Sequence, residues 1–168
     1  MRRAERFAYY MQTMHADSGE IDSGKLAEMA RTCACFNFRK VSRSVTQLFD
    51  QTLASTGLRS TQLVILITSE LLGPSSIARL ARELVMDRST LTRNLRPLLA
   101  QGLLRLTKSD QAKQKSVAIT PEGRDALIKA APLWENAQNR LVTRLGAEHW
   151  NQLMGELAGI VEATRSAP

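Results

Sequence analysis

Apolar residues recur at three- and four-residue steps along most of the chain, a period that predicts α-helices. The first 25 or so residues are polar and irregular, which predicts a tail or a short helix followed by a flexible link. One amphipathic helix is expected from about Met29 to Leu53. A second is expected after Ser60, with Leu63, Ile67 and Leu71 on its apolar face.

Two helices joined by a tight connection are predicted next. Ser75 or Ser76 is placed to cap a short helix, and Asp87 is a good N-cap for the helix that follows. A carboxylate at that position can accept hydrogen bonds from the first backbone amides, which have no partner inside the helix. The apolar stripe of this second helix consists of Leu91, Leu95 and Leu98.

The pattern then changes from a helical period to a strand period. LLRLT (103–107) and KSVAIT (115–120) flank the polar loop KSDQAKQ, which predicts a β-hairpin with a loop too long for a two-residue turn. Pro121 opens a long helical region, and Gly146 separates it from a last amphipathic helix. These terminal helices have more apolar residues on one face than the core of one small domain can bury.

Helices followed by a hairpin in this order predict a winged helix-turn-helix domain. The expected fold class is therefore mostly α with a small β-hairpin wing (α+β), carrying additional helices at both ends. In this arrangement the helix within residues 85–104 lies in the major groove of DNA, and the hairpin follows the phosphates or the minor groove. At 168 residues and 43% hydrophobic content, the chain is long and apolar enough to bury a core.

Positive charge is concentrated in this predicted domain. The formal net charge is +7, and residues 79–115 hold nine basic and three acidic side chains, which accounts for +6 of it. The other 131 residues hold 14 basic and 13 acidic groups. A local excess of this kind indicates a polyanionic partner, and double-stranded DNA is the expected one.

With its leucines turned inward, the helix within 85–104 presents arginine and hydroxyl side chains on its opposite face. Arginine can donate two hydrogen bonds to guanine or one to phosphate, and serine and threonine bond to base edges or phosphates. An ordinary solvated helix face is the alternative for the arginines alone, but the hairpin lysines favour DNA. The predicted DNA-binding residues are Arg88, Ser89, Thr90, Thr92, Arg93, Arg96, Lys108, Lys113 and Lys115.

The segment IARLARELVMDRSTLTRNLRPLLAQGLLRLT, followed by a polar wing and VAITPEG, closely resembles the multiple-antibiotic-resistance regulator (MarR) family of bacterial transcription factors. The resemblance extends over about residues 30–165. It implies a homodimer whose first and last two helices intertwine and place two winged domains over a pseudo-palindromic operator. It also implies a regulator, more specifically a repressor, that leaves DNA when an effector binds or a thiol is oxidised.

The resemblance divides the chain into an N-terminal extension, two dimerisation segments and a DNA-binding region. The extension is 1–28, the dimerisation helices are 29–58 and 121–166, and the winged helix-turn-helix region is 59–120. One departure lies in the wing, where Gln111 and Lys113 replace the Asp-x-Arg pair that is common in the family. Lysine keeps the attraction to phosphate but lacks the planar fork of arginine.

Two cysteines, Cys33 and Cys35, lie on the first predicted helix. Residues two apart on one helix point ~200° apart, so the pair cannot hold one metal or bond to each other within the helix. Cys35 and the residues after it are similar to the organic-hydroperoxide-sensing (OhrR) branch of the family, which implies a redox-active thiol. Arg39 stands where that branch has a tyrosine and is placed to favour the thiolate of Cys35. The alternative is that both cysteines are small buried hydrophobes.

No nucleophile motif, phosphate loop or metal-ligand spacing occurs in the sequence, so we expect no enzymatic activity, metal or cofactor. The start of the chain lacks signal-peptide features and no apolar run could cross a bilayer, so a cytoplasmic protein without a membrane partner is expected. Trp134 and Trp150 are expected in the dimer core or, alternatively, beside a small aromatic effector. Two rival functions stay open, namely a protein-interaction module of the same fold and a thiol-based peroxide-reactive protein using Cys35.

Overall fold

The computed structural model describes residues 21–109 and 112–165, and the side chains of residues 108–115 lie outside that description. The chain forms two compact units, one that ends at Arg43 and one that begins at Ser44. This boundary falls inside helix α3 (Ala34–Leu53). The predicted N-terminal extension lies mostly outside the described residues, but its last part belongs to helix α2 (Ser23–Thr32).

Helices α2 and α3 are separated by a break at Cys33, which has an extended backbone with φ −64° and ψ 114°. The Asn37 side chain donates hydrogen bonds to the carbonyl oxygens of Arg31 (3.1 Å) and Cys33 (2.9 Å). The bond to Arg31 satisfies a carbonyl that the break deprives of its helical partner. The expectation of one helix from Met29 to Leu53 is therefore wrong here, because neither glycine nor proline marks the break.

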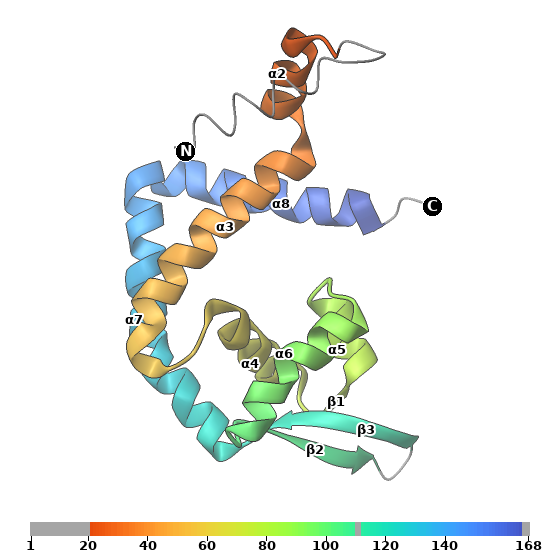
Figure 1. Ribbon diagram of the computed structural model, residues 1–168. Coiled ribbons are helices and arrows are strands. Elements are labelled where there is room, and N and C mark those ends of the chain that lie inside the picture. The colour runs from red at the N-terminus through yellow and green to blue at the C-terminus, as the bar shows by residue number, and fades with distance from the viewer. Residues whose placement is uncertain (1–20, 110–111, 166–168) are drawn as a thin grey trace, which may run out of the picture. The chain divides into compact units, whose positions relative to one another are not determined.

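The second unit contains the winged helix-turn-helix fold that the sequence predicts. In Figure 1, helices α4, α5 and α6 lie together beside a small sheet, and α7 leads from the sheet to α8. Its further elements are η1 (Ala54–Thr56), α4 (Ser60–Leu72), β1 (Ser75–Ser76), α5 (Ile77–Glu83), α6 (Arg88–Ala100), β2 (Leu104–Ser109), β3 (Ala112–Ile119), α7 (Pro121–Leu145) and α8 (Ala147–Arg165). The winged helix-turn-helix fold class, mostly α with a small β wing, is confirmed.

The sheet has three antiparallel strands in the order β1-β3-β2, of which the sequence predicted only the hairpin. Leu104 pairs with Ile119 and Lys108 with Lys115, and the register shifts after Lys108. Strand β2 ends at Ser109 and strand β3 begins at Ala112, so the expectation of a loop too long for a two-residue turn is wrong. The two strands pair through residues of the polar segment KSDQAKQ, because the hydrogen bonds between strands join backbone groups and do not require apolar side chains.

The core lies between α4, α5, α6 and the sheet. Buried side chains in the second unit include Leu53, Leu63, Ile65, Leu66, Leu80, Leu91, Leu95, Leu98, Leu104 and Val117. In α4 the predicted apolar face is wrong, because Ile65, Leu66 and Ser69 are buried while Leu71 is 81% exposed. The centre of α4, residues 63–67, is wholly apolar, so it has no polar face from which its orientation can be predicted.

The start of α7 is held tightly to the end of α6. The Thr120 hydroxyl donates to the Gly102 carbonyl (2.7 Å), lies 3.1 Å from the Leu103 carbonyl, and accepts from the Gly123 amide (3.0 Å). The Thr120 amide also donates to the Leu103 carbonyl (3.1 Å). We call this contact between residues 102–103 and 120–123 the α6–α7 joint.

Helices α7 and α8 expose apolar side chains in the single chain. Small residues are the ones that α7 buries, namely Gly123, Ala130 and Ala137, and α8 buries none among the described residues. Trp134 is 40% exposed and Leu145 is 42% exposed. Among the described residues, no helix combines the length and apolar content that crossing a bilayer requires.

Candidate nucleic-acid interface

The recognition helix α6 begins at the N-cap that the sequence predicts. The Asp87 carboxylate accepts hydrogen bonds from the Ser89 hydroxyl (2.6 Å) and the Thr90 amide (2.7 Å). Hydrogen bonds from Ser89 and then Thr90 hold the pKa of Asp87 well below its usual range. The carboxylate is therefore ionised at neutral pH and opposes the positive end of the helix dipole.

The two faces of α6 differ as the leucine spacing predicts. Its leucine stripe is buried, whereas the opposite face is open to solvent. Exposed residues on that face are Arg88, Ser89, Thr92, Arg93 and Arg96, while Thr90 is half-buried. Of the predicted site residues, these six therefore lie together on one helix.

Hydrogen bonds within α6 set what its hydroxyl groups can offer a ligand. The Thr92 hydroxyl donates to the Arg88 carbonyl (2.6 Å), and Ser89 donates to Asp87. Both hydroxyl protons are used, so each oxygen is left to accept a hydrogen bond, for example from an amino group of adenine or cytosine. Arg93 Nη2 donates to Thr90 Oγ1 (3.2 Å), which fixes one side of the guanidinium.

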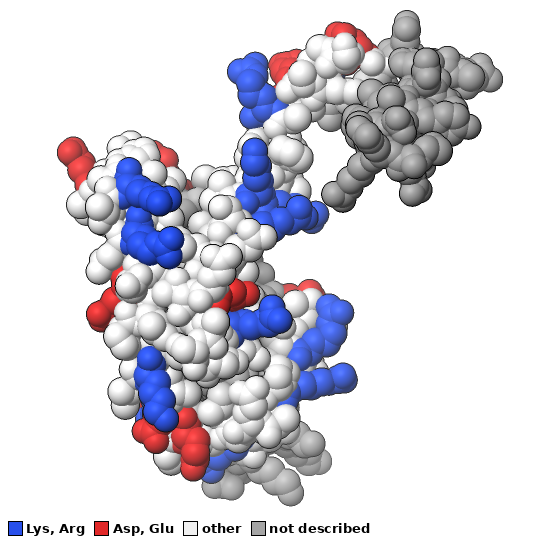
Figure 2. Space-filling model, turned by 60° about the vertical axis from the view of Figure 1, so that its left-hand side comes forward, with Lys and Arg blue, Asp and Glu red and all other residues white. Residues whose placement is uncertain are grey.

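Within the described chain, the arginines of α6 lie without acidic partners. Helix α6 contains no acidic residue, and within the described part of the chain no carboxylate forms an ion pair with Arg88, Arg93 or Arg96. On the face drawn in Figure 2, lysine and arginine side chains occur at several separate places, and acidic side chains lie near some of them. Positive charge alone therefore does not mark the interface, and α6 differs because it gathers three exposed arginines on a helix without an acidic residue.

The predicted wing residues are placed by the backbone alone. Lys108 lies in β2 opposite Lys115 in β3, and Lys113 lies two residues before Lys115 in the same strand. The strand positions of Lys108 and Lys113 correct the expectation of a loop there. Their contact with DNA stays a prediction.

Both cysteines belong to the first unit, whereas α6 belongs to the second. Cys33 and Cys35 are both exposed in the single chain. Their burial as small hydrophobes in a dimer stays a prediction. Cys33 lies at the break between α2 and α3, so Cys33 and Cys35 do not lie on one continuous helix. The prediction that the two side chains point ~200° apart assumed such a helix. Arg39 is exposed on α3. Among the described residues, no three His, Cys, Asp or Glu side chains gather as a metal site would require.

The hydrogen bonds that orient side chains at the start of α6 were not predicted from the sequence. The Asp87–Ser89 and Thr90–Arg93 contacts follow from spacings of two and three residues at a helix start, which could have suggested them. A cavity between η1, the end of α6 and the start of α7 was not predicted either. Its lining comes from segments far apart in the chain, and no local signal marks it.

A helix-turn-helix with an open basic recognition helix and a β wing defines the class of winged helix-turn-helix proteins. The M. tuberculosis transcriptional regulator MosR, solved in complex with DNA, is 33% identical, with a TM-score of 0.72 over 80% of this chain and 97% of that chain. This chain belongs to the MarR family of transcriptional regulators. The similarity of Cys35 and its neighbours to the OhrR branch stays a prediction.

More distant structures share the fold. Mutant MarR from E. coli, complexed with operator DNA, is 17% identical, with a TM-score of 0.72 over 84% of this chain and 99% of that chain. A MarR-family regulator from Silicibacter pomeroyi is 21% identical, with a TM-score of 0.65 over 84% of this chain and 97% of that chain. No protein-family model matches the chain, and no curated protein sequence does.

Proposed function

We propose that the protein is a sequence-specific DNA-binding transcription regulator that acts in the cytoplasm as a homodimer and has no enzymatic activity. The observation that carries the proposal is the outer face of α6, where Arg88, Arg93 and Arg96 are exposed without acidic partners in the described chain. A helix that served only as scaffold would gain stability from acidic residues one turn away. The structure of the relative MosR with bound DNA supports the same partner.

Each predicted residue takes a role that its chemistry permits. Arg88, Ser89, Thr92 and Arg93 act at base edges and nearby phosphates, because they lie in the first turns of α6. Arg96 and the wing lysines Lys108, Lys113 and Lys115 act mainly at phosphates. Thr90 is half-buried and accepts from Arg93, so we assign it to orienting that arginine.

We assign dimer formation to residues 29–58 and 121–166 and DNA binding to residues 59–120. Apolar side chains on the dimer segments lie open in the single chain, and burial of such surface drives association. They include Phe36, Val41, Trp134, Leu145, Ile160 and Val161. Two α6 helices related by a twofold axis would read a pseudo-palindromic operator.

The wild-type protein is expected to retain a DNA fragment from its own promoter region in a gel-shift assay, in preference to unrelated DNA of equal length. Because cationic side chains release counterions from phosphates, retention should fall steeply between about 50 and 200 mM salt. Retention without sequence preference would contradict a specific regulator. Loss of all retention, with capture of a protein partner, would favour the interaction module.

We further propose that the protein is a repressor that leaves its operator when an effector binds or a thiol is oxidised. A ligand weakens DNA binding only to the extent that it binds the DNA-free dimer more tightly than the DNA-bound dimer. An oxidation likewise weakens DNA binding only if it is more favourable in the DNA-free dimer. The helix break at Cys33, two residues before Cys35, supports the thiol route. Oxidation would act there at a connection between two helices.

Peroxide treatment is expected to weaken operator retention by the wild type, by about 5- to 150-fold, and to leave a Cys35→Ser variant unchanged. A serine hydroxyl cannot form the sulfenic acid that a reactive thiolate forms. Gel shifts before and after treatment, with a thiol reductant to restore binding, measure the effect. Cys33→Ser is the matched control and should respond as the wild type does.

Normal release by the Cys35→Ser protein would contradict a role for this thiol. Consumption of many peroxide equivalents per chain would point instead to the thiol-based peroxide-reactive protein, since a sensor is oxidised once.

A further inference from the structure

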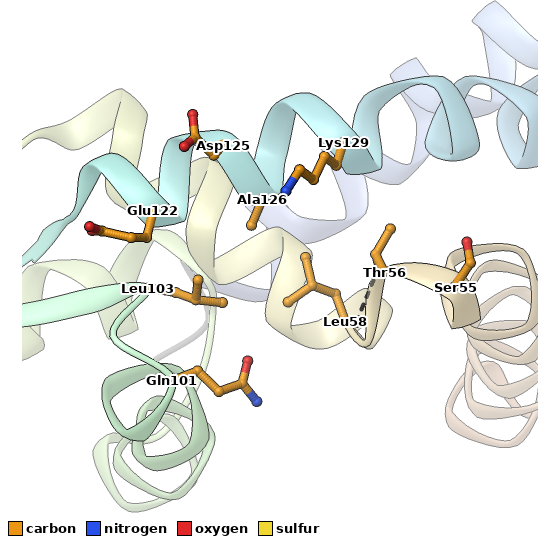
Figure 3. A pocket seen from close by; sticks show the side chains of 9 residues that line it. All are labelled: Ser55, Thr56, Leu58, Gln101, Leu103, Glu122, Asp125, Ala126 and Lys129. Atoms are coloured by element: carbon orange, nitrogen blue, oxygen red, sulfur yellow. Dashed lines mark hydrogen bonds between the residues drawn. The ribbon is translucent and has the colours of Figure 1, made fainter.

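A short connection, residues 54–59, joins helix α3 to helix α4. The Thr56 hydroxyl donates to the Leu53 carbonyl (2.7 Å) and accepts from the Leu58 amide (3.1 Å). Figure 3 shows the second of these bonds, with the Leu58 side chain turned toward α7. Leu53 and Leu58 are both buried in the core. The connection is therefore anchored, and we call residues 50–60 the α3–α4 elbow.

One carboxylate ties the two helices of the α3–α4 elbow to each other. Asp50, in the last turn of α3, accepts a hydrogen bond from the amide of Ser60, the first residue of α4 (2.7 Å). Among the described residues, no other hydrogen bond joins α3 to α4. The first four amides of a helix have no partner inside that helix, and the Ser60 amide is one of them. Asp50 therefore caps α4 from a neighbouring helix.

The charge of Asp50 suits this position. Its side chain is 27% exposed, and a carboxylate at the start of a helix opposes the positive end of the helix dipole. Arg59 Nη1 lies 3.8 Å from Asp50 Oδ2, but the Arg59 side chain is 77% exposed, so solvent screens this ion pair. A hydrogen bond to a charged acceptor is stronger than one between neutral groups. The bond to the Ser60 amide is therefore the contact that sets the angle of the α3–α4 elbow.

We propose that Asp50 is a positioning residue that fixes the α3–α4 elbow and thereby sets which half-site spacing of DNA the dimer accepts. The inference rests on the proposed function, in which α3 belongs to the dimer segment and α4 to the DNA-binding region. In a dimer, the direction of α4 from α3 contributes to the distance between the two α6 helices. That distance must match the separation of the two half-sites. A rigid elbow makes any other separation costly, so Asp50 acts on spacing and not on base recognition.

Gel shifts with the full-length protein test this role. They use the promoter fragment that the protein retains and copies of it with one base pair inserted or removed at the centre of the binding site. One base pair moves the half-sites by about 3.4 Å and turns them by about 35°. The wild type is expected to prefer the native spacing by about tenfold or more. Asp50→Ala should narrow this preference to about threefold, because the α6–α7 joint still holds the second connection, and should keep the preference at single altered base pairs.

Ser60→Pro breaks the same hydrogen bond from the donor side. Proline has no amide hydrogen but is favoured at the first position of a helix. Arg59 already has the extended backbone that a following proline requires (φ −91°, ψ 154°). The buried Ser60 hydroxyl has no hydrogen-bond partner among the described residues, so its removal breaks no second bond. The spacing preference should narrow as in Asp50→Ala, and the double variant should show no further narrowing.

Two further variants separate positioning from the loss of a charge. Asp50→Asn keeps an oxygen that can accept the Ser60 amide, so it should retain most of the preference for the native spacing. Asp125→Ala removes an exposed carboxylate from α7, and thus the same charge, and should leave the preference unchanged. Circular dichroism checks that each variant is folded. If Asp50→Ala is unfolded, Ser60→Pro decides.

An unchanged spacing preference in the folded variants that lack the Asp50–Ser60 bond would overturn the role of Asp50, as would an equal narrowing in Asp125→Ala. A wild type that accepts all three spacings equally would also overturn it. Loss of base preference together with spacing preference would show that Asp50 supports the fold of the DNA-binding region and does not set spacing. A wild type that retains no DNA at any salt concentration would overturn the proposed function, and the role of Asp50 with it.

Discussion

Replacing Gly123 by alanine is expected to lower the free energy of unfolding by about 3 kcal/mol. A Cβ at this position would lie 2.2 Å from the Leu103 carbonyl oxygen and 2.6 Å from Ile119 Cγ1. The Leu103 carbonyl cannot move aside freely, because it accepts the Thr120 amide in the α6–α7 joint. Urea unfolding followed by circular dichroism, at one fixed protein concentration, measures the loss.

Gly155→Ala is the matched control, because it adds the same methyl group inside a helix. A Cβ at Gly155 meets no atom within 4 Å, and alanine is favoured over glycine in helices by about 1 kcal/mol. The control should therefore be as stable as the wild type or slightly more stable. Equal stability of the two variants would show that the joint can open without cost, and its role in holding α7 to α6 would have to be abandoned.

The recognition helix could be predicted from the sequence because its signals are local. Asp87 is followed by leucines at four- and three-residue steps, and these two features fix both where α6 begins and which face it buries. The same reasoning placed Arg88 and Arg93 on the open face. A helix that is polar on one side therefore reveals its orientation without knowledge of its neighbours.

Features that depend on distant contacts could not be predicted. The apolar face of α4 was assigned wrongly, because the sheet and α6 decide which of its many apolar residues are buried. Strand β1 has two residues and exists only through pairing with β3. The cavity is also of this kind, since Leu58, Gln101 and Lys129 meet only in the folded chain.

Replacing Arg93 by alanine is expected to weaken operator binding by about 1 to 3 kcal/mol for each recognition helix in contact and to relax the base preference at one position. The reason is that the Arg93 guanidinium is exposed and unpaired by any described carboxylate, while Thr90 Oγ1 fixes one of its nitrogens. Titrations against the operator and against operators altered at single base pairs measure both effects. Arg140→Ala on α7 is the matched control and should change neither.

The contact with Thr90 makes this prediction sharper. Thr90→Val removes the acceptor that orients Arg93 but keeps the guanidinium, so it should weaken binding less than Arg93→Ala does. If Thr90 acts only through Arg93, adding Thr90→Val to Arg93→Ala should cause no further loss. Additive losses would mean that Thr90 contacts DNA itself. Equal weakening of Arg93→Ala on every altered operator would show that Arg93 binds a phosphate and that another side chain of α6 reads the base, because phosphate contacts carry no direct sequence information.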